Sequence, residues 1–77
     1  MPDPSELDKL DVLLTHWIDH NNTHKEEYIK WANKAKELGA VASGYAILEA
    51  VESVKKINEL LAKAKTLRNN NVNTNAH

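Results

Sequence analysis

The chain has 77 residues, so it forms at most one domain. It contains no cysteine, which excludes disulfides and thiolate metal sites. Its formal net charge of −1 gives no basic field to attract nucleic acid, and no stretch is apolar enough to span a membrane. A chain this small buries only about 60% of the surface that its unfolded form exposes, so a bound metal or self-association is the expected source of added stability.

The two ends of the chain differ from its middle. The N-terminus lacks the basic start and apolar core of a signal peptide, so we expect a cytoplasmic protein. Residues 1–4 contain two prolines and are expected to be a disordered N-terminus, with Ser5 as the N-cap of the first helix. Residues 5–68 form the predicted helical domain. Residues 69–77 are rich in asparagine, have no apolar period, and are expected to be a disordered tail.

The first helical segment runs to Leu38, and Gly39 is its expected C-cap. Thr23 followed by Glu26 matches a capping box, which would split the segment into helices near 6–20 and 24–38, followed by a third near 40–68. The apolar phase argues against that break, because one stripe, expected to form the core, continues through it: Leu10, Leu14, Trp17, Tyr28, Trp31, Ala35 and Leu38. Within this stripe and His24, one row continues at intervals of seven: Leu10, Trp17, His24, Trp31 and Leu38. We therefore favour one continuous helix and leave open whether it is kinked near Asn21.

A second helix is predicted from about Ala40 to Arg68. Its apolar positions follow helical spacing: Val41, Gly44, Ile47, Leu48, Val51, Val54, Ile57, Leu61, Ala64 and Leu67. Gly44 costs about 1 kcal/mol in a helix relative to alanine. We expect it to admit a bulky neighbour such as Trp17 or Trp31.

These segments predict an all-α antiparallel helical hairpin. Residues 1–38 carry five Lys/Arg and eight Asp/Glu, whereas residues 39–77 carry five and three, so the two halves complement each other mildly in charge. Two helices alone bury little, so we expect a homodimer that forms a four-helix bundle. A three-helix bundle monomer is the alternative.

Three histidines, His16, His20 and His24, are spaced one helical turn apart in the first helix. Neighbours at i and i+4 share a face, and two imidazoles can reach one ion at about 2.0–2.1 Å. His16 and His24 are about 12 Å apart along a straight helix, so the three cannot form one site. They form two overlapping clusters, one completed by Glu27 and the other by Asp19. The candidate metal ligands are His16, His20, His24 and Glu27.

The second helix offers no further ligand, because the stretch that faces the histidines is apolar: Val51, Val54, Ile57 and Leu61. A second copy of the chain, or water, would have to complete the coordination. Nitrogen ligands suit Ni, Co or Zn. Two alternatives stay open: a polar layer of His20, Asn21 and Asn58 that fixes the register of the helices, and a pH switch made of stacked imidazoles.

The residues from His16 to His24 form a His-Trp-x-x-His-Asn-x-x-His pattern, followed by Tyr28 and Trp31. This pattern resembles small uncharacterised prokaryotic helical proteins, over about the first forty residues of the chain. The resemblance implies a link to the handling of nickel or cobalt, with the three histidines as the functional positions. We therefore predict a non-catalytic accessory protein that binds a divalent transition metal. The alternative is a ligand-free helical protein-interaction module.

Overall fold

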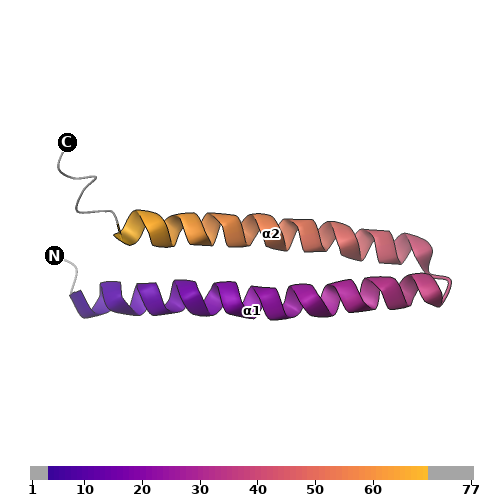
Figure 1. Cartoon of the computed structure of the whole chain (residues 1–77), viewed down its shortest axis with the longest axis horizontal. Helices are drawn as coiled ribbons and strands as arrows, with labels where there is room; N and C mark the ends of the chain where they lie inside the picture. The colour runs from indigo at the N-terminus through magenta and orange to yellow at the C-terminus, as the bar shows by residue number, and fades with distance from the viewer. Residues whose placement is uncertain (1–3, 70–77) are drawn as a thin grey trace.

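The computed structural model describes residues 4–69, which form two long helices. Helix α1 spans Pro4–Glu37 and helix α2 spans Val41–Asn69. The two helices lie side by side and run in opposite directions (Figure 1). No strand occurs among the described residues. The predicted all-α hairpin is therefore confirmed.

The helices extend beyond the expected position at each outer end. Helix α1 begins at Pro4, so Ser5 lies inside the first turn and the prediction that it is the N-cap is wrong. A proline is tolerated in the first turn, where its missing N–H would have no partner. Helix α2 ends at Asn69, one residue into the expected tail. The rest of both expected tails, residues 1–3 and 70–77, lies outside the described residues.

Helix α1 is continuous through Asn21, Asn22 and Thr23, as the apolar phase predicts (Figure 1). The hydroxyl of Thr23 donates to the carbonyl oxygen of Asp19, at 3.2 Å, instead of capping a new helix. This bond to the preceding turn is the usual one for a threonine inside a helix. The three-helix alternative is therefore wrong.

Gly39 ends α1 in the predicted way. It has a positive φ of 90°, which glycine adopts without strain. The Gly39 N–H donates to the Lys36 carbonyl at 3.1 Å, and the Ala40 N–H donates to the Ala35 carbonyl at 2.8 Å. This pair of bonds is a Schellman motif, which satisfies the last carbonyl groups of α1 and reverses the chain into α2.

The contact between the two helices is a narrow line, which we call the seam. Its buried apolar residues are Leu14, Ala32 and Val51. Half-buried positions continue it with alternating steps of three and four: Leu7, Asp11, Ile18, Asn21, Lys25 and Ala35 on α1, and Ile47, Val54, Asn58, Leu61, Lys65 and Arg68 on α2. This spacing is that of helices packed as an antiparallel coiled coil.

Leu14 and Ala35 of the predicted apolar stripe lie in the seam, but the row at intervals of seven lies beside it. Leu10, Trp17, Trp31 and Leu38 are 38%, 41%, 57% and 71% exposed. The seam follows positions one residue later, where small Ala32 permits close packing and a tryptophan would hold the helices apart. The second helix departs from expectation in the same way, because four of its predicted apolar positions are exposed: Val41, Ile57, Ala64 and Leu67.

Gly44 is buried in the seam, but no tryptophan approaches it. A Cβ built at this position would lie 2.7 Å from the carbonyl oxygen of Ala32 and 2.8 Å from Cγ of Lys36. The expectation that Gly44 admits Trp17 or Trp31 is therefore wrong. The glycine instead lets the backbones of the two helices approach each other near the turn.

Three asparagines pair across the middle of the seam. Asn21 donates from Nδ2 to Oδ1 of Asn58 at 3.0 Å, and Asn58 donates from Nδ2 to Oδ1 of Asn22 at 3.0 Å. The predicted polar layer is thus present with Asn22 as its third member, and His20 lies outside it. Part-buried amides in the seam have few alternative partners, so this layer fixes which turn of α1 lies beside which turn of α2.

Candidate functional site

The three histidines form one continuous row of ring contacts on α1, stacked between His16 and His20 and edge to face between His20 and His24. The ring centroids of His16 and His20 are 5.9 Å apart, and those of His20 and His24 are 4.5 Å apart. The Tyr28 ring stacks on His24 at 6.1 Å. Helical spacing alone accounts for this row of ring contacts, because each ring is one turn from the next.

His20 and His24 approach each other most closely. Their Nε2 atoms are 2.9 Å apart, in an N–H···N hydrogen bond. Two nitrogens bound to one ion at about 2.05 Å are about 2.9 Å apart at a 90° bond angle and about 3.3 Å apart at a tetrahedral angle. The two nitrogens are therefore already at the spacing of a two-imidazole chelate.

Glu27 contacts the opposite side of the His24 ring. Its Oε1 is 3.2 Å from Nδ1 of His24, with the Glu27 side chain 60% exposed. A neutral His24 that donates from Nδ1 to this carboxylate keeps the lone pair of Nε2 available. A carboxylate behind a histidine in this way fixes the orientation of the ring as a ligand. In this arrangement Glu27 faces away from the paired Nε2 atoms.

His16 lies outside the close pair. Its ring stacks on His20, but the close contact between two histidine nitrogens in the described hairpin is the one that joins His20 and His24. Among residues 4–69, no three His, Asp or Glu side chains are grouped closely enough to hold an ion. The His20–His24 pair is therefore half of a coordination sphere.

Helix α2 adds no ligand at this level of the hairpin. The bonds from Asn58 to Asn21 and Asn22 set the register, so α2 residues near position 55 lie beside His24. Those residues are Val54, Lys55 and Lys56, and both lysines are paired with glutamates of their own helix, at 3.3 and 3.8 Å.

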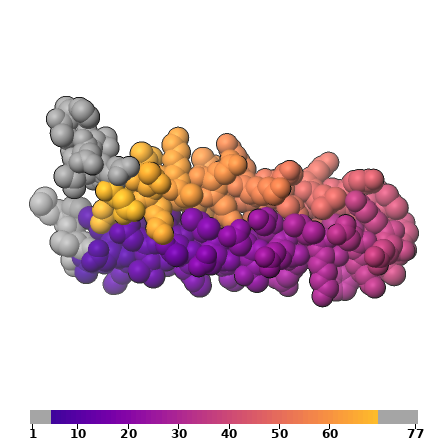
Figure 2. Space-filling model, viewed as in Figure 1, coloured from indigo at the N-terminus to yellow at the C-terminus, as the bar shows by residue number. Residues whose placement is uncertain are grey.

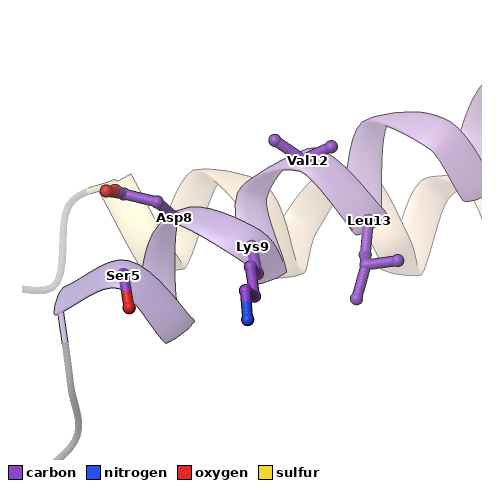
Figure 3. Close-up of a pocket in the computed structure, with 5 residues that line it drawn as sticks. All are labelled: Ser5, Asp8, Lys9, Val12 and Leu13. Carbon is purple, nitrogen blue, oxygen red and sulfur yellow. The ribbon is translucent and has the colours of Figure 1, made fainter.

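A shallow depression elsewhere on α1 offers no comparable chemistry. It lies on the outer surface near the N-terminal end and is lined by Ser5, Asp8, Lys9, Val12 and Leu13 (Figure 3). Figure 3 shows Asp8 and Lys9 pointing to different sides of the helix, and Val12 and Leu13 doing the same. The polar groups do not converge, as those of a binding site do.

Comparison with known proteins places the chain in a family. Residues 10–67 match the model of a domain of unknown function, DUF8180. The chain belongs to the DUF8180 family. The matched residues include the three histidines, the turn and most of α2.

A relative from Archaeoglobus fulgidus, described as an uncharacterized protein, is 31% identical to this DUF8180 chain over 58 residues. The match covers 75% of this chain and 92% of the relative, so the likeness extends over nearly the whole archaeal protein. No solved structure matches the chain. Neither helix of the described part meets the length and hydropathy that a membrane span requires.

Proposed function

We propose that this DUF8180 protein is a non-catalytic accessory protein that binds a divalent transition metal through His20 and His24. The observation that supports this is the 2.9 Å separation of the two Nε2 atoms, which matches a chelate with a bond angle near 90°. The ion would lie about 1.4 Å to the side of the line that joins the two nitrogens. Binding would therefore displace the shared proton and turn each ring toward that point, with little change in the separation of the two nitrogens.

The chemistry of the pair favours Ni, Co or Zn. Imidazole suits these ions, and the chain has no thiolate that would favour a softer metal. Glu27 would hold the His24 ring in the correct tautomer, as carboxylates behind metal-bound histidines do. We further propose that the His-Trp-x-x-His-Asn-x-x-His pattern carries this function and that the protein acts in the cytoplasm.

Calorimetric titration of the untagged protein with Ni(II), Co(II) and Zn(II) tests the proposal. His20→Ala and His24→Ala should each weaken binding at least tenfold, because each removes half of the chelate. His16→Ala is the matched control, since it removes a histidine of the same row of ring contacts that makes no nitrogen contact with the pair. No heat with any of the three ions, or an equal loss in all three variants, would refute the proposal.

A ligand-free protein-interaction module is the second candidate. The observation that favours it is the number of large apolar side chains left at the surface of the described hairpin, among them Trp17, Trp31, Tyr45 and Leu60. It predicts that added metal and chelator leave the melting temperature and every binding partner unchanged. The titration above separates the two candidates.

A further inference from the structure

The hairpin has one side that is polar and one that is apolar. The polar side is marked by a groove that both helices line, with Asn22 and Lys25 from α1 and Lys55, Glu59 and Ala62 from α2. Lys36 of α1 also lies over the ring of Tyr45 on this side, 4.5 Å from its centroid. In an antiparallel pair, residues that immediately follow the seam on both helices share one side, and residues that precede it share the other.

The other side, which we call the open face, is mostly apolar. Helix α1 and the turn that follows it contribute a row one residue before the seam, Leu10, Trp17, His24, Trp31 and Leu38, with Leu13, His20 and Lys34 beside it. Helix α2 contributes Ser43, Ala46, Ala50, Ser53, Ile57, Leu60, Ala64 and Leu67. All of these residues except His24 are exposed in the hairpin, which forms a single layer of two helices (Figure 2).

The row on α1 has the same residue types at equal distances on either side of His24. Trp17 and Trp31 lie seven residues on either side of His24, and Leu10 and Leu38 lie fourteen on either side. An interface between two copies related by a two-fold axis needs this symmetry, because residue i contacts j and j contacts i. An axis perpendicular to the helices at His24 would place each leucine and each tryptophan opposite its counterpart in a second copy.

The same two-fold axis also sets residues of α2 opposite residues of α2 in the second copy. Position 55 is the midpoint of Val41–Asn69, and the asparagine pairs place it at the level of His24. Small residues before position 55 then oppose large ones after it in three of the four pairs, Ser43 with Leu67, Ala50 with Leu60 and Ser53 with Ile57, whereas Ala46 opposes Ala64. Alternation of small and large side chains is how packed layers interdigitate.

The size of the open face suits a dimer. A 29-residue helix is about 44 Å long, and two packed helices present a face about 18 Å wide. That gives about 800 Å² for each copy, which is the area that a stable protein–protein interface buries on each partner. Only three apolar side chains are buried among the described residues of the single hairpin, so covering this face would supply most of the apolar core.

We propose that a second copy of this chain covers the open face, antiparallel, with the two-fold axis at His24. A further consequence rests on the proposed metal function. The His20–His24 pair is centred two residues from the axis, so the pairs of the two copies are separated by about 6 Å along the helices. Position 27 of the second copy lies at the level of position 21, between the two histidines. The second copy thus brings imidazole and carboxylate groups to the level of the half-filled coordination sphere.

Sedimentation equilibrium without added metal tests the interface by itself. The wild-type protein should have twice the 8.7 kDa mass of the chain. Ala50→Glu places a charge on the open face and should give the single mass. Ala62→Glu is the matched control, because Ala62 is equally exposed on α2 but lines the polar groove, and this variant should stay dimeric. Circular dichroism checks that both variants remain helical.

Disulfide trapping tests the position of the axis in the same cysteine-free chain. The Leu10→Cys/Leu38→Cys variant should form a covalent dimer under mild oxidation, whereas Val12→Cys/Leu38→Cys should not, because Val12 lies off the open face. The two thiols of one chain are about 42 Å apart along α1, so they cannot close on each other.

The proposed interface is wrong if the wild-type protein is a monomer. It is also wrong if Ala50→Glu and Ala62→Glu have the same effect on the mass, or if the two double-cysteine variants form covalent dimers to the same extent. Metal binding by a monomer would then still support the proposed function. A dimer that binds no metal would leave the interface standing and refute the proposed function.

Discussion

Gly44 lies against Ala32 so closely that a Cβ at position 44 would be 2.7 Å from the Ala32 carbonyl oxygen. Backbone cannot move aside as a flexible side chain can. Helix propensity by itself would make alanine more stable than glycine here by about 1 kcal/mol. Close packing makes alanine the less stable residue at this position, because the added methyl group must separate the two helices.

Gly44→Ala should therefore lower the free energy of unfolding by about 1–3 kcal/mol, as overpacking in a core does. Chemical denaturation followed by circular dichroism measures it. Glu49→Ala, at an exposed position of α2 outside the seam and the open face, should change stability by less than about 0.5 kcal/mol. A Gly44→Ala variant as stable as the wild type would mean that the helices do not approach as described.

The fold was predictable from sequence because its determinants are local. The Gly39 C-cap and the unbroken apolar phase across Asn21–Thr23 are enough for one long helix, a turn and a second helix. The rotation of the helices about their axes was not predictable in the same way. The most apolar row, with Trp17 and Trp31, is a better candidate for burial than the mixed row that contains Asp11 and Lys25.

The candidate site was also predictable from the sequence only in part. Helical spacing predicts that His20 and His24 share a face, and their close contact follows from it. Spacing alone does not choose which ring nitrogens meet, so Glu27 could be placed in the cluster but not on Nδ1 of His24. The third member of the polar layer, Asn22, was missed because it lies just outside the seam row, where only the pairing geometry reveals it.

Single and double substitutions in the asparagine layer should have opposite effects on the stability of the hairpin. Asn58→Ala leaves Asn21 and Asn22 without their partner and should cost about 1–2 kcal/mol, because part-buried amides lose their hydrogen bonds. Asn21→Leu/Asn58→Leu replaces two members with apolar groups and should be at least as stable as the wild type, with a less specific register. Chemical denaturation compares the stabilities. A double variant less stable than Asn58→Ala would contradict this account.

The ends of the two helices are joined by an ion pair between Asp11 and Arg68. Nη2 of Arg68 is 3.7 Å from Oδ2 of Asp11, and the side chains of Arg68 and Asp11 are 26% and 30% exposed. Asp11→Lys should lower the melting temperature through repulsion, and Asp11→Arg/Arg68→Asp should restore much of the loss. The pair is partly solvated and should contribute at most about 1 kcal/mol, decreasing as salt is added. Equal melting temperatures for the single and exchanged variants would exclude a direct interaction.

Glu27 is expected to support the metal-binding pair from behind. Glu27→Gln removes the carboxylate that contacts Nδ1 of His24 and should weaken Co(II) or Ni(II) binding about tenfold, the lower end of the range for groups that orient a metal ligand. The absorption spectrum of bound Co(II) should stay unchanged, because the ligand atoms are the same. Glu26→Gln, an adjacent exposed glutamate, is the matched control and should bind like the wild type. A changed Co(II) spectrum in Glu27→Gln would instead show that this carboxylate coordinates the ion directly, and equal affinity in both variants would show that it takes no part.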